Sequence, residues 1–585
     1  MRKPEPGTFE LGLVMAGAVS AGAYTAGVLD FLFEALQDWE DAKAKTPGEV
    51  PDHRIQIRAV AGASAGGIAS ALTAMVPFTR HHPVRDLHKA TTAAKPANAS
   101  RNLFYRCWVR DVDLTTMLDT GDIRERHVPS LLNGDPVARI ADEAIATVRH
   151  SPPLGGMPWF ANPLQLFLKV TNLRGVPYLI NMVTDDGIRG HRVISHADHA
   201  HFAVFGTTGG EGEGLPPGAT AVNFEGTLGT PDDGWEGVRD AALATSAFPV
   251  GLPARALKND LRCYEARPWA RPAGVSLDEE PPSIRPDCPP HLMRPYEFWS
   301  VDGGLINNEP LEAARVALSG APDVHNERHP EKADRAVLMI DPFPDDIGPS
   351  VPEHGEMPDI LGSAFALLPT LKNQARFKPE EVMLAMHEDI YSRFLIAPRR
   401  GDRKGMETHI ASGGLGGFAG FVDAQLRMHD FQLGRRNAQK FLRDHLVIHR
   451  NNPIVRDWVV RMEADGRLED YQPRRRGPGG TEKVDRDFVQ LVPLVGNARR
   501  AVPERPWPQL KWNDVKARLQ DGMDARAEVL ARAMVHRGLD FLGLKDRRLL
   551  SRLIDAIVTR QIRNASRNKA LSAIQEDLRT RGLLR

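Results

Sequence analysis

The sequence predicts an α/β domain with a mainly parallel central sheet, followed by a helical C-terminal region. Short apolar runs typical of buried strands alternate over residues 1–350 with segments whose apolar residues recur at helical spacing. After residue 355 the strand signal fades and helical patterns dominate. A chain of 585 residues is also long enough to bury a large core.

The same patterns place the elements of the first domain. Strands are expected at 10–15, 54–61, 166–170, 178–183 and 336–340. The first strand leads into a helix, whose apolar face is formed by Val28, Leu29, Leu32, Phe33 and Leu36. The second strand leads into a helix of small residues that runs to Met75. Loops rich in Gly and Pro are interpreted as insertions near 206–236 and 265–297.

Beyond residue 355, a helical extension is expected over 355–470, with helices at 361–377, 379–397 and 421–446. A stretch rich in Pro, Gly and Arg at 471–483 is interpreted as a linker to a helical region at 484–585. This last region is basic, because residues 499–585 hold 20 Lys and Arg against 10 Asp and Glu.

One helix of the basic region is amphipathic, which is typical both of a solvated bundle and of a helix that docks on an anionic membrane surface. Its apolar face consists of Leu549, Leu550, Leu553, Ile554 and Ile557. Much of its other side is occupied by Arg548, Arg552, Arg560, Arg563 and Arg567.

Composition excludes several classes of protein. The 75 Lys and Arg residues balance 75 Asp and Glu residues, so no overall charge attracts the chain to nucleic acid. A hydrophobic content of 42% with 26% charged residues fits a globular protein, not a disordered or multi-pass membrane protein. The cysteines, Cys107, Cys263 and Cys288, are far apart, which favours a reducing compartment over a disulfide framework or zinc ribbon.

The uncharged stretch at 11–29 is long enough to mimic a membrane span or the apolar part of a signal peptide. Pro4, Glu5, Pro6 and Glu10 interrupt the approach to it, and the stretch itself is rich in glycine and alanine. We therefore interpret it as a strand and helix inside the fold. Export or membrane anchoring is the alternative.

Residues 62–66, Gly-Ala-Ser-Ala-Gly, have the G-x-S-x-G pattern of a nucleophile elbow. The expected strand precedes the motif and the expected helix follows it, as an elbow requires. Gly62 and Gly66 permit the tight turn that lifts the Ser64 hydroxyl out of the sheet, and the helix N-terminus favours negative charge at a reacting acyl group. A tight turn without catalysis is the alternative interpretation.

A second loop of small residues, 17–22, follows the first expected strand. Such a loop turns successive backbone N–H groups toward a bound carbonyl oxygen and so forms an oxyanion hole. The rival interpretation is a nucleotide phosphate loop. No G-K-[ST] follows, however, and the G-x-G-x-x-G spacing is missing.

A third element, Asp302-Gly303-Gly304, comes directly after the apolar run 298–301. An aspartate followed by two glycines is usually a turn. Gly303 and Gly304 would also let another backbone segment, or a catalytic serine, approach the Asp302 carboxylate closely.

In this order the three elements resemble the patatin-like phospholipases. The family pattern is a Gly-rich oxyanion loop after the first strand, a G-x-S-x-G elbow after the next strand, and a later D-G-G or D-G-A. Residues 22–29, which begin with Gly22, are similar to the helix after the family's loop, and 244–249 resemble the segment upstream of its aspartate. The resemblance covers residues 8–345 and implies a three-layer α/β fold.

The oxyanion loop departs from the family pattern. Where the family has three consecutive glycines, this sequence has Gly17, Ala18 and Val19, and Ala21 replaces the usual arginine. Backbone N–H groups survive these changes, but a β-branched Val19 resists positive φ and crowds a close ligand. Substrate class and rate are therefore expected to differ more than reaction type.

The resemblance implies a serine–aspartate dyad without histidine, metal or organic cofactor. Asp302 would act as general base on the Ser64 hydroxyl, which would attack an ester carbonyl. The backbone N–H groups of Gly17, Ala18 and Val19 would hold the oxyanion, and water would then hydrolyse the acyl-enzyme. The implied substrates are phospholipids or other lipid esters.

Other candidates for chemistry have ordinary alternatives. His196, His199 and His201 could hold a metal, but they lie in a stretch expected to be irregular and without a nearby thiol. His429 and Asp430 could complete a Ser-Asp-His arrangement, although a surface or capping pair is the simpler interpretation. The glycines between 413 and 420 could hinge a lid or form a plain loop.

The sequence therefore predicts a lipid acyl hydrolase that acts through Ser64 and Asp302. A transacylase or a non-lipid esterase on the same site is the alternative among enzymes. The alternative outside enzymes is a catalytically silent scaffold that binds lipid or membrane. We expect a cytoplasmic protein with peripheral membrane contact through its basic C-terminal helices and no nucleic-acid partner.

Overall fold

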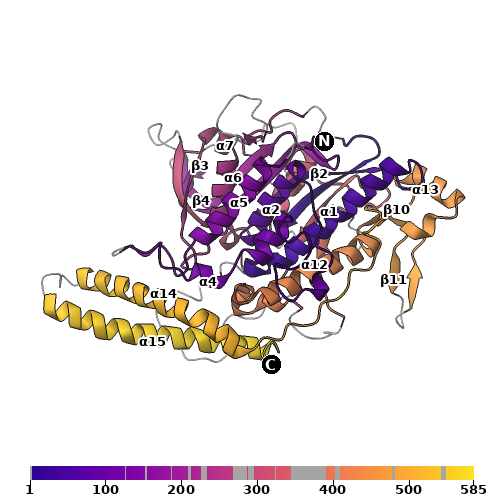
Figure 1. Ribbon diagram of the computed structural model, residues 1–585. Helices are drawn as coiled ribbons and strands as arrows, with labels where there is room; N and C mark the ends of the chain where they lie inside the picture. The colour runs from indigo at the N-terminus through magenta and orange to yellow at the C-terminus, as the bar shows by residue number, and fades with distance from the viewer. Residues whose placement is uncertain are drawn as a thin grey trace.

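A nine-stranded sheet organises the described part of the chain (Figure 1). The computed structural model describes all residues except 1–2, 125–126, 152–153, 186, 209–211, 225–233, 268–285, 288–294, 323, 344–369, 371–373, 375–390, 402–408, 477–480 and 542–547. Most of the predicted insertion at 265–297 therefore lies outside the described residues, whereas most of the one at 206–236 lies inside them. Most of the predicted helices at 361–377 and 379–397 also lies outside the described residues.

The centre of the sheet is parallel, as predicted. Its five parallel strands follow the spatial order β3-β2-β1-β8-β9. Their bounds are β1 (Thr8–Met15), β2 (Arg54–Ala63), β3 (Phe160–Thr184), β8 (Arg335–Ile340) and β9 (Arg393–Ile396). The two strands expected at 166–170 and 178–183 are one long strand, β3.

Four further strands complete the sheet beyond β3. β4 pairs antiparallel with β3 and parallel with β5, while β7 pairs antiparallel with both β3 and β6. Their bounds are β4 (Gly187–Val204), β5 (Thr220–Val222), β6 (Arg255–Asn259) and β7 (Tyr296–Asp302). The pairing of β7 with β3 brings the end of β7 next to the end of β2.

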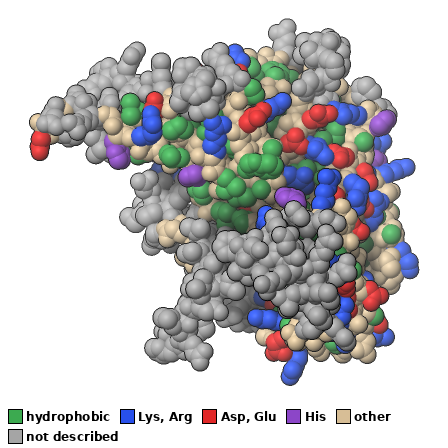
Figure 2. Space-filling model, turned by 90° about the vertical axis from the view of Figure 1, so that its left-hand side faces the viewer, with side chains coloured by type: hydrophobic (Ala, Val, Ile, Leu, Met, Phe, Trp, Pro, Cys, Tyr) green, Lys and Arg blue, Asp and Glu red, His purple; other side chains and the backbone are tan. Residues whose placement is uncertain are grey.

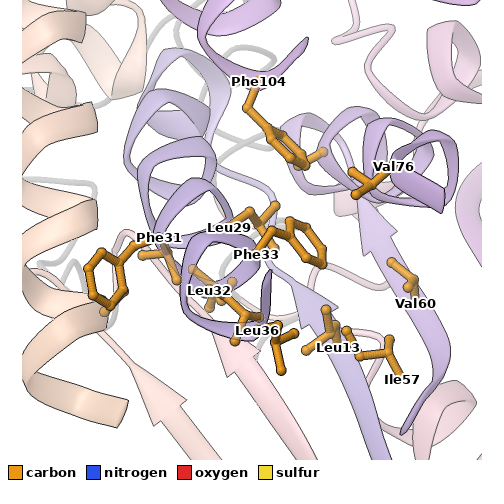
Figure 3. Close-up of a cluster of buried hydrophobic side chains, with 14 of the residues drawn as sticks. Leu13, Leu29, Phe31, Leu32, Phe33, Leu36, Ile57, Val60, Val76 and Phe104 are labelled. Atoms are coloured by element: carbon orange, nitrogen blue, oxygen red, sulfur yellow. The ribbon is translucent and has the colours of Figure 1, made fainter. Parts of the chain in front are cut away.

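Helices cover both faces of the sheet. Alternate residues of β1 point to opposite sides: Leu13 belongs to the main core, whereas Val14 packs in a second cluster with α8 (Leu311–Ser319). On the main side α1 (Gly22–Lys45) and α2 (Ala65–Met75) lie on the strands (Figure 3). Burial on both faces explains why the central strands read as uninterrupted apolar runs.

α1 is the helix that the apolar N-terminal stretch predicts. Within the described residues one helical stretch, Val19–Lys45, is long and apolar enough to cross a membrane by length and composition. Of its most apolar window, 94% is buried inside the protein, between the sheet and α12 (Ala424–Asp444).

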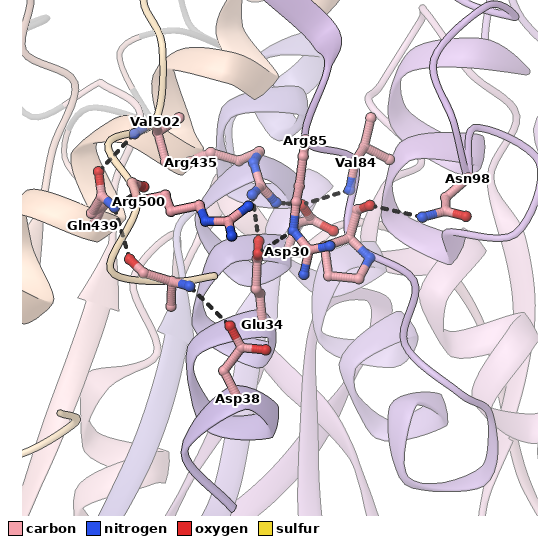
Figure 4. A network of polar contacts seen from close by, with 12 residues as sticks. Asp30, Glu34, Asp38, Val84, Arg85, Asn98, Arg435, Gln439, Arg500 and Val502 are labelled. Carbon is pink, nitrogen blue, oxygen red and sulfur yellow. Dashed lines mark hydrogen bonds and ion pairs between the residues drawn. The ribbon is translucent and has the colours of Figure 1, made fainter. Parts of the chain in front are cut away.

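A buried ion cluster joins α12 to α1 (Figure 4). The Arg435 guanidinium pairs with the carboxylates of Asp30 and Glu34, and all three side chains are almost fully buried. Arg85 binds Glu34 from the outer side at 2.5 Å. Because an uncompensated buried charge is costly, this cluster fixes how the C-terminal region sits on the first domain.

The C-terminal region is mainly helical but does not form a separate layer. β9, inside the predicted helix 379–397, extends the central sheet beside β8. The predicted linker at 471–483 contains an antiparallel hairpin, in which β11 (Arg474–Arg476) pairs with β12 (Glu482–Val484). A second two-stranded sheet consists of β10 (Val447–His449) and β13 (Phe488–Gln490). The helix α13 (Arg456–Ala464) follows β10 in the chain.

Two long helices, α14 (Trp512–Phe541) and α15 (Arg548–Thr580), lie side by side at the C-terminal end of the chain (Figure 1). Arg563 pairs with Glu528, and Arg567 pairs with Asp524. These two arginines of the predicted basic face therefore have acidic partners within the helix pair. The side chains of 549–560 lie outside the described residues.

Candidate active site

Ser64 occupies a strained turn between β2 and α2. Its φ of 53° and ψ of −128° are unusual for a residue with a side chain, as the elbow motif predicts. Gly66 is required because a Cβ there would lie 2.1 Å from the carbonyl oxygen of Met15. The turn therefore fits tightly against the end of β1.

The Ser64 hydroxyl donates a hydrogen bond to Asp302. The distance from Oγ to Oδ2 is 2.6 Å, and the residues are only 7% and 4% exposed. Asp302 ends β7, where it pairs with Val170 of β3. Its other oxygen, Oδ1, accepts from the Gly304 N–H at 2.7 Å. Ser64 and Asp302 are 238 positions apart in the sequence and meet where β2 and β7 end.

Thr245, which sequence reasoning did not single out, supports this pair. Its Oγ1 accepts the Ser64 N–H at 2.9 Å and donates to the carbonyl of Lys169. Thr245 ends α6 (Trp235–Thr245), so the hydroxyl ties the elbow to that helix and to β3. Residues 244–249 resemble a segment of the family, but this resemblance did not predict a function for Thr245.

The predicted oxyanion loop lies beside Ser64. The Gly17 N–H donates to the Asn308 carbonyl at a long 3.4 Å, whereas the N–H groups of Ala18 and Val19 have no acceptor among the described residues. Val19 adopts a φ of 48°, the positive value that a β-branched residue resists. The two free N–H groups are the ones in a position to receive a ligand oxygen.

Asn308 is a second residue whose role was not predicted. Its side chain is 1% exposed, and neither its Oδ1 nor its Nδ2 has a hydrogen-bond partner among the described residues. A Cβ on Gly17 would lie 2.3 Å from that Oδ1 and 3.0 Å from the Ser64 Cβ. A carboxamide without a partner among the described residues therefore lies directly behind the loop and close to Ser64.

An apolar pocket opens from Ser64 between α2, α5 (Asp135–Arg149) and α6, with an empty volume of about 960 Å³ including its open mouth. Aliphatic and aromatic side chains form most of its wall. Cys107 is part of the wall, and burial raises the pKa of its thiol to about 12, so the thiol stays neutral. The pocket suits a hydrocarbon chain attached to a carbonyl held at Ser64.

The three candidate metal-binding histidines do not converge. They lie in the regular strand β4, not in an irregular stretch, and His196 faces the Asn172 carbonyl while His201 stacks on Phe167. Burial lowers the pKa of His201 to about 3, which keeps the ring neutral. Among the described residues no group of three or more His, Cys, Asp or Glu side chains could hold a metal ion.

His429 and Asp430 form a buried pair with a structural role. The His429 Nδ1 lies 2.7 Å from Asp430 Oδ1, and its Nε2 faces Arg400. The Asp430 carboxylate accepts the N–H groups of Ala411 and Ser412. Asp430 thus caps the turn at 411–412, while Ser64 already has Asp302 as its partner.

Comparisons with known proteins show the family of the chain. The profile of the patatin-like phospholipases matches residues 13–315. The chain belongs to this family. It is also 35% identical over 601 aligned positions to a protein of Sinorhizobium fredii (strain NBRC 101917 / NGR234) titled "Uncharacterized protein y4iI", covering 94% of this chain and 80% of that protein.

Among solved structures, one similar chain is VipD from Legionella pneumophila, with 10% identity, a TM-score of 0.20, and coverage of 96% of this chain and 88% of VipD. A TM-score this low carries no argument about the fold. The family match, by contrast, spans the elbow, the oxyanion loop and Asp302, and the patatin-like phospholipases are lipid acyl hydrolases.

Proposed function

We propose that the protein is a serine acyl hydrolase that cleaves lipid acyl esters through the Ser64–Asp302 dyad. The observation that carries this proposal is the 2.6 Å hydrogen bond from Ser64 Oγ to Asp302 Oδ2 beside the apolar pocket. The family match supports lipid esters as the general substrate class.

The reaction follows from the placement of these groups. As Ser64 Oγ attacks the ester carbonyl carbon, its proton passes to Asp302 Oδ2 and the carbonyl oxygen gains the negative charge. The N–H groups of Ala18 and Val19, which have no acceptor among the described residues, stabilise that oxyanion in the proposed reaction. The intermediate then expels the alcohol, which takes the proton from Asp302, and water repeats the sequence on the acyl-enzyme.

An exposed apolar surface on β3, β4 and β7 also suits contact with lipid aggregates. Figure 2 shows hydrophobic side chains gathered on the side of the molecule where β3 and β4 lie. Exposed apolar residues of these strands and of β7 include Leu173, Ile194 and Trp299, the last being 60% exposed and three positions before Asp302. Exposed apolar patches of this kind mark surfaces that meet a lipid or another protein.

Labelling with a fluorophosphonate, followed by peptide mapping, tests the proposal. We expect label on Ser64 in the wild type, none there in Ser64→Ala, and a labelling rate reduced by about 10²-fold or more in Asp302→Asn. Ser246→Ala is the matched control, because Ser246 also lines the pocket but bonds to Ala242 and Leu243 carbonyls.

Absence of label on Ser64 in the presence of mixed micelles would refute the proposal and favour a silent lipid-binding scaffold. With label established, radioactive acyl phospholipid distinguishes two reactions: release of free fatty acid indicates hydrolysis, whereas transfer of the acyl group to added lysophospholipid indicates a transacylase.

A further inference from the structure

Residues 411–422, which we call the strap, lie against the oxyanion loop although they belong to the C-terminal region. Two tight turns, η8 (Ala411–Gly413) and η9 (Leu415–Gly417), lead into the short helix α11 (Ala419–Val422). The Ser20 hydroxyl donates to the Gly417 carbonyl and accepts the Gly420 N–H at 3.0 Å. Hydrogen bonds thus join the strap to the loop, although Ser20 and Gly417 are 397 positions apart in the sequence.

Helices of the C-terminal region hold the strap from its other side. The Asp430 carboxylate of α12 accepts the N–H groups of Ala411 at 2.7 Å and Ser412 at 2.8 Å. Asp577 of α15 accepts the Leu415 N–H at 3.0 Å. Because the strap is bonded to helices at Ala411, Ser412 and Leu415 and to the loop at Gly417 and Gly420, its backbone is held in place along most of its length.

The strap fits directly over Val19. A Cβ on Gly417, which has a φ of 94°, would lie 3.2 Å from the Val19 Cβ, so a glycine lets the two backbones approach closely. Val19 in turn keeps its positive φ under this cover, a strained conformation that surrounding contacts must offset. The strap therefore shapes the loop that is proposed to bind the oxyanion.

The strap also completes the wall of the apolar pocket with Phe418 and Phe421. The Phe418 ring meets the Phe248 ring edge to face, with 5.7 Å between the centroids. Phe418 directly follows Gly417, which covers Val19, and Val19 and Ser64 line the same pocket. We therefore assign the Phe418 ring to the wall at the catalytic end of the pocket. In the proposed reaction, the acyl carbon next to the ester carbonyl lies at this end of the pocket.

The pocket continues far from this narrow end. α2 forms one wall from Ala65 to Met75, and at 1.5 Å per residue it extends about 16 Å from Ser64. Each methylene buried along such a wall contributes about 0.8 kcal/mol. A pocket that is narrow beside the carbonyl and deep beyond it favours an acyl chain that is long and unbranched.

We infer that Phe418 of the strap excludes acyl groups branched next to the carbonyl, so that among lipid esters the site selects those with a linear acyl chain. The inference rests on the proposed function, because it describes the acyl group that Ser64 accepts. It also gives the region beyond residue 355 a part in substrate choice.

The test compares kcat/KM of the full-length protein for p-nitrophenyl palmitate, its α-methyl-branched analogue and p-nitrophenyl butyrate. We expect the wild type to prefer the linear palmitate over the branched ester by about tenfold or more, since a misfitting methyl group costs about 1–3 kcal/mol. Phe418→Ala should reduce this preference by about tenfold. Ratios on one variant do not depend on how much of it is folded.

Two further variants sharpen the test. Ala71→Phe fills the pocket deep along α2, so it should lower the ratio of palmitate to butyrate activity by about tenfold while butyrate is still cleaved. Phe488→Ala, at a partly buried phenylalanine of β13 outside the pocket, is the matched control and should leave both ratios unchanged. If Phe418→Ala does not fold, Phe418→Leu should also reduce the preference for the linear over the branched ester, but by a smaller factor.

Equal activity of the wild type on the linear and the branched ester, or an unchanged preference in both Phe418 variants, would overturn the inference while the hydrolase assignment stands. Failure of the proposed function looks different. In that case no ester would be cleaved in a way that depends on Ser64.

Discussion

The Thr245 hydroxyl offers the sharpest test of the site's geometry. It accepts the Ser64 N–H at 2.9 Å and donates to the Lys169 carbonyl. Replacement of Thr245 by valine keeps the shape of the side chain and removes both hydrogen bonds. The Ser64 N–H then stays buried without its acceptor.

The expected magnitude follows from two costs. A buried N–H without a partner costs about 1–3 kcal/mol, so Thr245→Val should lower the free energy of unfolding by about 2 kcal/mol. Ser64 also depends on its neighbours to keep a φ of 53°. If misalignment of the Ser64 hydroxyl raises the activation free energy of labelling by about 1.4 kcal/mol, the labelling rate falls about tenfold.

Urea unfolding measures the first effect, and the rate of fluorophosphonate labelling of the folded fraction measures the second. Thr245→Ser is the control because it keeps the hydroxyl and removes only the methyl group beside Gly67, at a cost of about 1 kcal/mol. The reasoning is refuted if the serine and valine variants match each other in both stability and labelling rate.

Two more variants and one pH titration test other parts of the structure. Gly66→Ala should abolish labelling of Ser64, because its Cβ would meet the Met15 carbonyl at 2.1 Å. Burial lowers the pKa of His53 to about 3. As the pH falls below about 6.5, His53 therefore binds a proton in the unfolded chain but not in the folded protein. The free energy of unfolding, measured in urea, should thus be about 2 kcal/mol lower at pH 5 than above pH 6.5. Arg435→Met leaves buried Asp30 without its cation and should cost about 3–5 kcal/mol in thermal or urea unfolding.

Each of these has its own control. Gly237→Ala should be tolerated, because its Cβ would lie 3.5 Å from Phe202, and equal loss of labelling in both glycine variants would contradict the steric argument. His53→Gln should flatten the decline of stability between pH 7 and pH 5; an unchanged decline would assign it to other groups. Arg436→Met removes only a half-exposed pair with Glu504, so its cost should stay within about 1 kcal/mol.

Local patterns were sufficient to predict the central sheet, because strands buried on both faces are apolar without interruption. They were not sufficient for β9, whose four residues, Arg393–Ile396, lie in a region with helical composition. A strand this short owes its conformation to pairing with β8, and such pairing leaves no periodic signal in the sequence. The hairpin within 471–483 was missed for the same reason.

The site shows the same division. The elbow at Ser64 and the turn at Asp302 were predictable because glycines beside each of them leave a local signature. Thr245 acts through a hydrogen bond to a residue 181 positions away, and Asn308 lies behind Gly17 only in the folded chain. No spacing rule reveals either contact.

Val19 shows how a local conflict is resolved by distant residues. The sequence indicates that a β-branched residue resists positive φ, and the structure nevertheless gives Val19 a φ of 48°. The conflict is offset by the strap, which bonds to the neighbouring Ser20 and places a glycine, Gly417, over the side chain. The loop and the strap are therefore one unit in energetic terms: a glycine at position 19 would relieve the strain, whereas a larger residue at 417 would push against the loop. The conformation of the loop at 17–22 thus depends on residues that lie outside the matched family segment, 13–315.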